Sequence, residues 1–196
     1  MTEKKMALEI MNACLDLIVE IGLNEVTTAK IAQRVNTSEN TIYRNFKNKQ
    51  DLIEKTLLRC SKELLISIEN IQQKDISAVE KISEIIEFHL DYNMRHSGIS
   101  RLAFSEQIHL SDLSLRDVSR DHIQKYENIL AQILLVGIEQ KEIRSDLDVN
   151  MAAQNCIGLI FYSVHKWSIN NFYYDLRDEK EKITRYLEAS WTRVSS

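Results

Sequence analysis

Residues 27–52 read TTAKIAQRVNTSENTIYRNFKNKQDL. The spacing of their apolar residues and the positions of their polar capping residues predict two short helices joined by a tight turn, followed by the start of a third helix. One face of the first helix is apolar, formed by Ala29, Ile31, Ala32 and Val35. Thr27 stands where an N-cap residue accepts a hydrogen bond from a free helix amide. Asn36 tolerates the left-handed backbone of a sharp turn, so the first helix is predicted to end near it.

The second helix of this stretch is predicted to begin after Ser38 as its N-cap. Ile42 and Phe46 are four residues apart and are predicted to pack inward, whereas Tyr43 suits either position because its hydroxyl needs a polar partner. The outward-facing residues are Glu39, Asn40, Thr41, Arg44 and Asn45. Two helices in this arrangement have the outline of a helix-turn-helix motif, whose second helix enters the major groove of DNA.

Roles on DNA follow from the side-chain chemistry of the motif. Asn48 is predicted to cap the next helix with Asp51 as in a capping box, and the free amides at that helix start suit a backbone phosphate. The predicted phosphate anchors are Thr28, Thr41, Tyr43, Lys47 and Lys49. Glu39 can accept from cytosine and Asn40 or Asn45 can pair with adenine, and the sequence leaves open which of them touches a base.

The same stretch resembles the DNA-binding domain of the TetR family of transcriptional regulators. The matching residues keep the family's order and spacing: Gly22, Thr27, Ile31, Ala32, Val35, Ser38, Thr41, Tyr43, Phe46, Lys49 and Leu52. Asn36 and Thr37 depart from the Gly-Val that family members usually carry before the serine. The resemblance implies a repressor that is released from DNA by a small molecule bound in its C-terminal domain.

Composition favours an all-helical fold and limits the classes of function. The chain of 196 residues has no Pro and four Gly, which favours helices with short connections. Residues 26–59 hold seven basic and three acidic side chains, although the formal net charge of the chain is −4, so DNA contact is predicted to be local. Neither a signal peptide nor a membrane-spanning run is recognisable, which predicts a cytoplasmic protein with no membrane partner.

Cysteines and other reactive residues do not form a recognisable catalytic or metal-binding pattern. Cys14, Cys60 and Cys156 lie far apart and are predicted to be buried or partly buried thiols. No nucleophile elbow, phosphate loop or paired-carboxylate site stands out. We therefore expect no enzyme activity, no cofactor and no bound metal.

The whole chain is predicted to fold into about nine helices in two domains, a DNA-binding domain at 1–48 and a regulatory and dimerisation domain at 49–196. Gly22 is predicted to end the first helix, and His96-Ser97-Gly98 to form a break. Beyond the motif, the expected helices cover 5–21, 49–71, 77–95, a short segment through Leu102, Phe104 and Ile108, 113–141, 149–170 and 178–194.

The segment CIGLIFYSVHKW, residues 156–167, is apolar nearly all round, which predicts a helix buried on both sides. One side can face its own domain, and a second copy of the chain is the favoured partner for the other side. The resemblance to the TetR family implies a homodimer through the last two helices. Such a dimer presents two recognition helices about one DNA turn apart, ~34 Å, and therefore reads a palindromic operator in double-stranded DNA.

Polar and aromatic residues on otherwise apolar helices are the candidates for the pocket of a small hydrophobic inducer. The predicted pocket residues are His89, Tyr92, Phe104, Gln107, Tyr126, Asn155, Phe161 and Tyr162. Two alternatives remain. Residues 96–148 loosely resemble nucleoid-occlusion factors of the same family, which bind DNA and a protein partner, and a helical enzyme is the less favoured second alternative.

Overall fold

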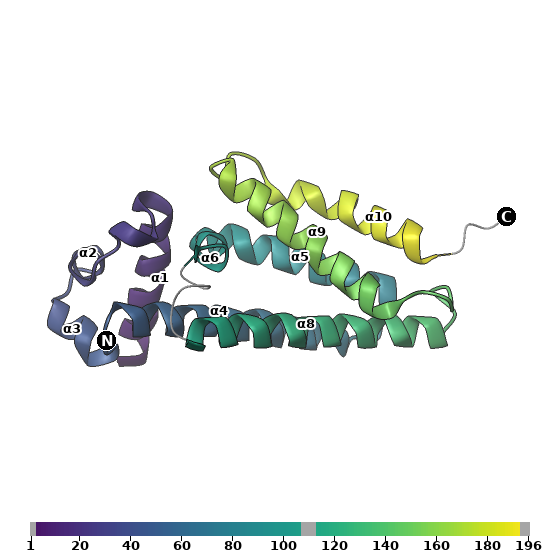
Figure 1. The fold of residues 1–196 in the computed structure, drawn as a ribbon, viewed down its shortest axis with the longest axis horizontal. Coiled ribbons are helices and arrows are strands. Elements are labelled where there is room, and N and C mark those ends of the chain that lie inside the picture. Colours follow the sequence, from purple (N-terminus) through teal and green to yellow (C-terminus); the bar gives the residue numbers. More distant parts are fainter. Residues whose placement is uncertain (1–2, 107–112, 193–196) are drawn as a thin grey trace. The chain divides into compact units, whose positions relative to one another are not determined.

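The computed structural model describes residues 3–106 and 113–192, which form helices and no strand (Figure 1). The predicted all-helical class is therefore confirmed for these residues. The α-helices are α1 (Glu3–Ile21), α2 (Thr28–Arg34), α3 (Glu39–Asn45), α4 (Lys49–Gln72), α5 (Ala78–Arg95), α6 (Ser97–Ala103), α8 (Leu113–Glu139), α9 (Val149–Ile169) and α10 (Lys180–Trp191). Two short 3-10 helices are η1 (Leu23–Glu25) and η2 (Leu176–Glu179). None of the helices in the described residues combines the length and apolar character needed to cross a membrane.

Contacts divide the chain into two compact units. The first unit comprises Met1–Lys62 and His96–Ser119, and the second comprises Glu63–Arg95 and Arg120–Ser196. This division differs from the contiguous domains predicted at 1–48 and 49–196 because α6, distant in sequence, packs against α1. Both α4 and α8 contribute residues to each unit.

The first unit is organised around α1, which contacts α2, α3 and α6. Its buried face is formed by Ile10, Ala13, Cys14, Leu15, Leu17 and Ile18. Gly22 follows the last turn with φ 82°, so the predicted helix end is confirmed and rests on the left-handed conformation that glycine adopts without strain. Ile21, the last residue of α1, is 37% exposed.

Helix α6 begins earlier than the sequence suggested. His96 precedes its first residue, whereas Ser97 and Gly98, predicted as part of a break, are helical. A Cβ at Gly98 would lie 2.2 Å from the Leu15 carbonyl oxygen, so this glycine allows two helices to approach closely instead of ending one. Arg101 donates a 2.7 Å hydrogen bond to the Val19 carbonyl and fixes the same contact. The expected extension of this helix past Phe104 is wrong, since α6 ends at Ala103, and Ile108 lies outside the described residues.

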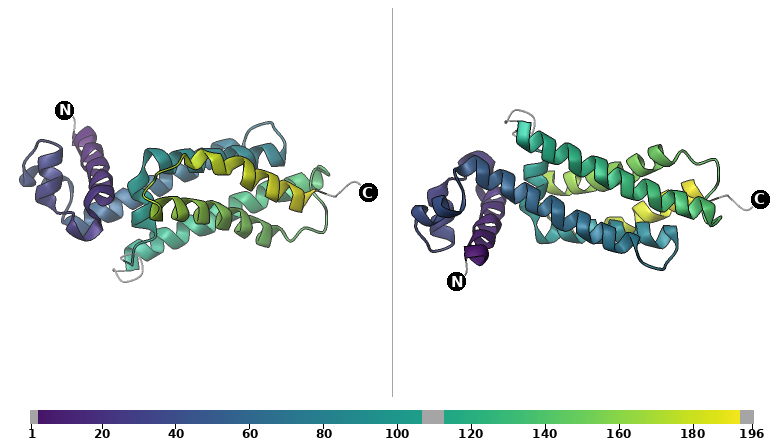
Figure 2. Two further views of the ribbon diagram at one scale, coloured as in Figure 1. Left: turned by 90° about the horizontal axis from the view of Figure 1, so that it is seen from above. Right: turned by 90° about the horizontal axis from the view of Figure 1, so that it is seen from below.

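The second unit contains α5, α9, α10 and the adjoining parts of α4 and α8, with a core of aliphatic side chains. Helices α9 and α10 run side by side and both contact α5 (Figures 1 and 2). The largest fully buried side chains here include Ile68, Ile82, Ile85, Ile86, Leu90 and Tyr126. Burial of such side chains stabilises the unit by roughly 1.5–3 kcal/mol each. Cys156 in this unit and Cys14 and Cys60 in the first are free and buried, as expected.

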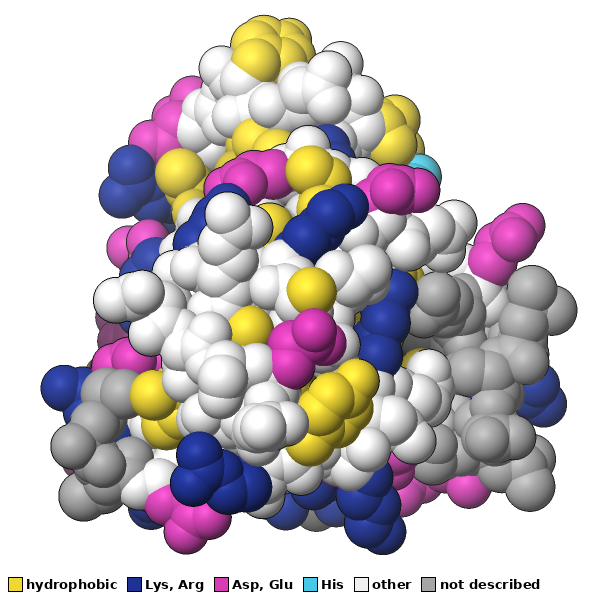
Figure 3. All heavy atoms as spheres, turned by 90° about the vertical axis from the view of Figure 1, so that its left-hand side faces the viewer, with side chains coloured by type: hydrophobic (Ala, Val, Ile, Leu, Met, Phe, Trp, Pro, Cys, Tyr) yellow, Lys and Arg dark blue, Asp and Glu magenta, His cyan; other side chains and the backbone are white. Residues whose placement is uncertain are grey.

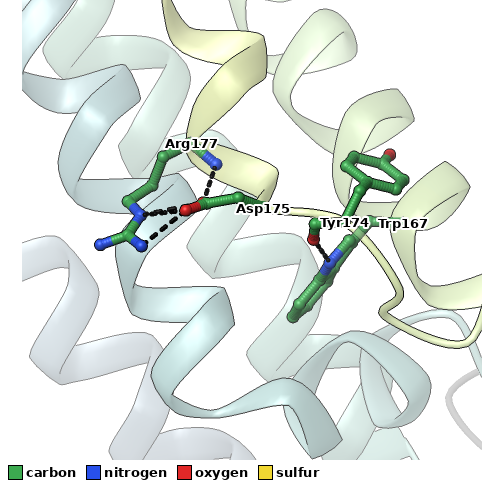
Figure 4. A network of polar contacts seen from close by, with 4 residues as sticks. All are labelled: Trp167, Tyr174, Asp175 and Arg177. Carbon is green, nitrogen blue, oxygen red and sulfur yellow. Dashed lines mark hydrogen bonds and ion pairs between the residues drawn. The ribbon is translucent and has the colours of Figure 1, made fainter.

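The connection between α9 and α10 is held by local hydrogen bonds (Figure 4). Trp167 near the end of α9 donates from Nε1 to the Tyr174 carbonyl at 2.8 Å, which folds the chain back onto the helix. Asp175 caps η2 by accepting from the Arg177 amide at 3.0 Å, and it also accepts from the Arg177 guanidinium. The final helix starts at Lys180 and not at Asp178, because the chain first forms the 3-10 turn η2.

Candidate functional site

The turn between α2 and α3 has the geometry expected from the sequence. The Thr27 hydroxyl accepts from the Lys30 amide at 3.2 Å, which confirms this N-cap. Asn36 has φ 50°, so it occupies the left-handed conformation that the turn needs. The following residue, Thr37, donates from its amide to the Ala32 carbonyl at 2.9 Å and closes the turn. Ser38 precedes α3 as predicted, but its hydroxyl lies 3.2 Å from the Thr41 hydroxyl and makes no capping bond to the backbone.

Helix α3 buries one face and exposes the other. Ile42 is 0% and Phe46 is 2% exposed, so both pack inward as predicted. Tyr43 is 51% exposed, which resolves its position in favour of the outward side. Glu39, Asn40 and Arg44 are also exposed. Ala29 of α2, which we had counted as inward-facing, is exposed, since the short helix rests on Ile31 and Ala32.

Three polar side chains link α2 to α3 on the outward surface. The Thr28 hydroxyl donates to a Glu39 carboxylate oxygen at 2.7 Å, and the Tyr43 hydroxyl lies 3.3 Å from the same Thr28 oxygen. These contacts hold two hydroxyl groups side by side. The Glu39 carboxylate is therefore engaged within the protein, and reading a base would require it to exchange this hydrogen bond.

Two further residues predicted to contact DNA, Asn45 and Arg44, form hydrogen bonds within α3 itself. The Asn45 side-chain amide donates to the Thr41 carbonyl at 2.8 Å and is partly buried. The Arg44 guanidinium lies 3.3 Å from the Thr41 hydroxyl, to which it donates, and its side chain is exposed. Of the three predicted base readers, Asn40 has the exposed amide, whereas Asn45 supports its own helix.

The start of α4 separates the two lysines that were predicted to bind phosphate. Lys49 donates from Nζ to the Leu23 carbonyl at 3.0 Å and lies 3.5 Å from the Asn24 carbonyl, so it joins this helix to the segment after α1. Lys47 has an exposed side chain. The predicted cap by Asn48 is confirmed, because its side-chain oxygen accepts from the Asp51 amide at 2.8 Å.

Asp51 completes a variant of the predicted capping box. Its carboxylate accepts from the Lys47 amide at 2.8 Å and from Lys55 Nζ at 2.9 Å, whereas a regular capping box returns to the cap residue itself. Partial burial alone raises the pKa of Asp51, but the hydrogen bonds from Lys55 and Lys47 bring that pKa below its usual value. The carboxylate thus stays charged and fixes the entry into α4.

Much of the positive charge near the motif is paired within the protein. Arg34 forms a bidentate ion pair with Glu20, and Lys30 donates to the Glu25 carbonyl at 2.8 Å. The side of the molecule that carries α2 and α3 accordingly shows Lys and Arg side chains scattered among acidic and uncharged ones, not gathered in one patch (Figure 3). Arg44 and Lys47 are the exposed cations on α3 and just after it.

A second cluster of polar groups lies in the core of the second unit. His89 of α5 stacks on Tyr126 of α8, with ring centroids 5.6 Å apart and His89 Nδ1 3.2 Å from the Tyr126 hydroxyl. Phe161 of α9 meets the His89 ring edge-on at 5.9 Å, and His122 meets the Tyr126 ring at 6.0 Å. Three of the predicted pocket residues, His89, Tyr126 and Phe161, are therefore brought together from three helices.

Burial makes this cluster electrically neutral. Desolvation, with a smaller contribution from the nearby His122, lowers the pKa of His89 to about 3, and desolvation lowers the pKa of His122 to about 4. Desolvation also raises the pKa of Tyr126 well above its usual value and that of Cys156 to about 12. At neutral pH the cluster therefore consists of two uncharged imidazoles, a phenol and a thiol.

The other predicted pocket residues are placed elsewhere or are not described. Tyr92 is buried, but its hydroxyl donates to Glu63 at 2.9 Å. Tyr162 is 64% exposed and Asn155 is exposed, both on the outer face of α9. Phe104, 41% exposed, belongs to the first unit. Gln107 lies outside the described residues.

Sequence reasoning missed His122 and the neighbouring Cys156. His122 precedes Tyr126 by four residues, which is one helical turn, so a search for polar groups stacked along one face of the helix would have found it. A surface groove of ≈ 620 Å³ in the same unit is lined by Lys74, Glu84, Glu87, Asp91 and Arg177 among others. Its charged lining suits an apolar ligand less well than the neutral cluster does.

Within residues 3–106 and 113–192, no group of three or more His, Cys, Asp or Glu side chains could hold a metal ion. The candidate sites are therefore an exposed hydrogen-bonding face on α2 and α3 and a buried neutral cluster in the second unit.

Two family models match the chain. The model described as "Bacterial regulatory proteins, tetR family" matches residues 10–56, which contain α2 and α3, and the model "YsiA-like protein, C-terminal region" matches residues 61–190. The fatty acid metabolism regulator protein of Bacillus subtilis is 32% identical over 171 residues, covering 86% of this chain and 87% of the relative. The nucleoid occlusion factor SlmA of Vibrio vulnificus is 24% identical over 168 residues, covering 86% of each.

Solved structures show the same architecture. The transcriptional regulator FadR from Bacillus subtilis, crystallised in complex with stearoyl-CoA, matches with a TM-score of 0.77 and 27% identity over 93% of this chain and 97% of that one. FadR from Bacillus halodurans matches with a TM-score of 0.81 and 21% identity over 93% and 94% of the two chains, which shows the fold alone.

Proposed function

Because the chain belongs to the TetR family of bacterial regulatory proteins, we propose that it represses its target genes by binding a palindromic operator and leaves the operator on binding a small molecule. Members of this family are DNA-binding regulators and not enzymes. They bind DNA as dimers, and they also bind small-molecule ligands. The observation that carries the proposal is the capped, preformed α2–turn–α3 surface. The protein acts in the cytoplasm, where its DNA lies.

On DNA, α3 enters the major groove and divides its contacts between phosphates and bases. In the proposed complex, backbone phosphates are contacted by the adjacent hydroxyls of Thr28 and Tyr43 and by the exposed Lys47. Asn40 and Arg44 face base edges, where Asn pairs with adenine and Arg with guanine. Glu39 orients Thr28 in the free protein and becomes available to a cytosine amino group when Thr28 turns to a phosphate.

The dimer forms through α9 and α10. Residues on the outer face of α9 are exposed although the helix is highly apolar, as Met151, Tyr162 and Ile169 are 53%, 64% and 66% exposed. Such a row of apolar side chains on a monomer marks an interaction surface. A two-fold dimer presents two copies of α3, so that each copy can read one half of the palindrome.

The ligand in this proposal is a long-chain acyl thioester. A FadR relative was crystallised with stearoyl-CoA, and a relative at 32% identity is named for fatty acid metabolism. The neutral cluster of His89, His122 and Tyr126 offers hydrogen bonds but no charge. A thioester carbonyl accepts such bonds, whereas a free carboxylate would be buried without a cation, which is costly. The acyl chain itself lies along the apolar core of the second unit.

Release of the protein from operator DNA tests the ligand. Stearoyl-CoA is expected to release the bound protein at concentrations where coenzyme A has no effect and stearate has less. Tyr126→Phe removes the cluster hydroxyl and is expected to weaken the response to stearoyl-CoA about tenfold, the loss of roughly one hydrogen bond. Tyr92→Phe is the matched control, because its hydroxyl contacts Glu63 instead. Equal responses of both variants, or release by coenzyme A alone, would contradict the assignment.

A second candidate function is nucleoid occlusion, favoured by the similarity to SlmA over 168 residues. It keeps the DNA-binding surface and replaces the small molecule with a protein partner. A nucleoid-occlusion factor is expected to remain on DNA in the presence of stearoyl-CoA and to occupy many chromosomal sites, whereas a repressor occupies few promoters. Mapping bound sites across the chromosome separates the two functions.

A further inference from the structure

We infer that two copies of this chain cross at Gly158, which forms the point of closest approach between the two α9 helices. The inference rests on the homodimer proposed above and goes beyond it by naming the residue on the two-fold axis. It concerns the described outer face of α9, because α5, α10 and η2 pack against the helix elsewhere.

The exposed residues of α9 fall on one continuous stripe. Between Asn150 and Asn170, those with exposed side chains or backbone are Asn150, Met151, Gln154, Asn155, Gly158, Tyr162, His165, Lys166, Ile169 and Asn170. At 100° per residue the exposed positions from Asn150 to Ile169 lie within about 160° of the helix circumference, and Gly158 is at the centre of this face. The opposite face is buried through Ala152, Ala153, Cys156, Ile157, Ile160, Val164 and Trp167.

Among the described residues, nothing requires a glycine at this position. A Cβ at Gly158 would meet no heavy atom of these residues within 4 Å, whereas a Cβ at Gly98 would lie 2.2 Å from the Leu15 carbonyl oxygen. Glycine in a helix interior is also less stable than alanine. A contact from outside the chain would account for this glycine, since a missing side chain lets a second backbone approach closely.

A second copy of the chain fits this face better than an unrelated partner. In a two-fold contact each residue near the axis meets its own copy, so a suitable face must tolerate self-contact. Helix α9 contains no Asp or Glu, and its exposed apolar side chains, Met151, Tyr162 and Ile169, lie on both sides of Gly158. The homodimer of the family supplies the occupant, and Gly158 lets the two axes come near enough for these side chains to interlock.

A cysteine at the crossing point gives a direct test. Disulfides form when two Cα atoms are about 4.4–6.8 Å apart, so Gly158→Cys is expected to cross-link two chains rapidly under mild oxidation. The native cysteines are buried and do not compete. Lys125→Cys is the matched control, since Lys125 is exposed on α8 and the variant places a thiol on the surface of a different helix. Failure of Gly158→Cys to cross-link beyond this control would overturn the inference.

Gly158→Ala gives an independent test, because it is expected to weaken the dimer and to stabilise the monomer. The added methyl is expected to weaken the dimer about tenfold in sedimentation, because it overpacks a close contact. The same change is expected to raise the melting temperature of the diluted monomer by a few degrees, because alanine favours the helix and meets no neighbour. A merely structural glycine would lower both.

The outcomes distinguish this inference from the homodimer on which it rests. If the wild type is a dimer, Gly158→Ala leaves its affinity unchanged and Gly158→Cys does not cross-link, the crossing point is refuted but the homodimer is not. A wild-type chain that stays monomeric at tens of micromolar refutes both. A wild-type dimer that is weakened by alanine and linked by cysteine supports both.

Discussion

The polar groups of α3 and those around Tyr126 are held in opposite ways. On the α2–α3 surface, the hydroxyls of Thr28 and Tyr43 and the carboxylate of Glu39 are near solvent, where water screens charge and side chains exchange hydrogen-bond partners at little cost. Around Tyr126 the imidazoles are desolvated, so their charged forms are strongly disfavoured.

This difference assigns each region its class of partner. A solvated surface with movable donors can adapt to a polyanion such as DNA, whose affinity comes mainly from phosphate contacts. A largely buried cluster of neutral donors disfavours charge, which suits the uncharged thioester proposed as its ligand. In the proposed function the two regions bind different classes of ligand, DNA and an acyl thioester, as a ligand-released repressor requires.

Acidification is expected to give the largest effect, and the histidines of the buried cluster are expected to contribute strongly to it. The folded pKa values of His89 and His122 lie below the unfolded value of 6.5, so the unfolded state binds more protons in acid. Their contribution to stability is complete above pH 6.5 and is lost as the pH falls toward 4 and 3, at about 1.4 kcal/mol per pH unit for each histidine. Denaturant unfolding from pH 7 to pH 4 measures this loss.

His89→Phe isolates this contribution from that of the carboxylates, which also protonate in acid. The variant is expected to be less stable at pH 7, since Tyr126 loses its partner, but to lose stability less steeply below pH 6.5. A variant with the same pH slope as the wild type would show that His89 is not held neutral in the fold.

Asn40→Ala is expected to have the next largest effect, on DNA preference. Loss of a bidentate contact to adenine costs about 1–3 kcal/mol on the preferred operator and relaxes selectivity at one base pair. Asn45→Ala is the comparison, because the Asn45 amide is bonded to the Thr41 carbonyl and is expected to act on helix stability instead. Binding to a set of operator variants measures both, and a changed base preference with Asn45→Ala would reverse the two roles.

Lys47→Ala and Lys49→Ala separate phosphate binding from structural support. Lys47 is exposed, so its loss is expected to weaken all DNA sequences alike and to reduce the slope of log affinity against log salt by about one. Lys49 is bonded to the Leu23 carbonyl, so its loss is expected to lower thermal stability with little change in that slope. The reverse pattern would restore Lys49 as the phosphate anchor predicted from sequence.

Substitutions at Asn36 are expected to give the smallest effects. Asn36→Gly removes the cost of a side chain at φ 50° and is expected to stabilise the first unit by less than about 1 kcal/mol. Asn36→Val puts a β-branched residue in the same conformation and is expected to destabilise it by about 1–2 kcal/mol. Equal melting temperatures for the two variants would mean that the turn is not held in this conformation in solution.

Local chemistry explains why the motif was predictable. The caps at Thr27 and Asn48, the turn at Asn36 and the inward positions of Ile42 and Phe46 depend on residues within four positions of one another. Lys49 was harder to place, because its ammonium group contacts a carbonyl 26 residues earlier in the chain. The resemblance to the TetR family predicted the fold as a whole.

Long-range packing explains why the second unit was only partly predictable. Helical spacing shows which residues share a face of one helix, but not which face meets another helix. His89, Tyr126 and Phe161 meet because three helices converge, whereas Tyr162, next to Phe161 in sequence, lies on the exposed face of α9. Gly98 was read as a break because the approach of α1 that it permits cannot be seen in sequence.

The most direct test is binding of the full-length protein to DNA from upstream of its own gene. Fluorescence anisotropy at about 150 mM salt compares a palindromic fragment with a scrambled fragment of equal length. We expect two chains per palindrome and an affinity at least about 10³-fold higher than for the scrambled fragment, lowered by Asn40→Ala and abolished by stearoyl-CoA. Equal affinity for both fragments would contradict the assignment of α3 as the sequence-reading helix.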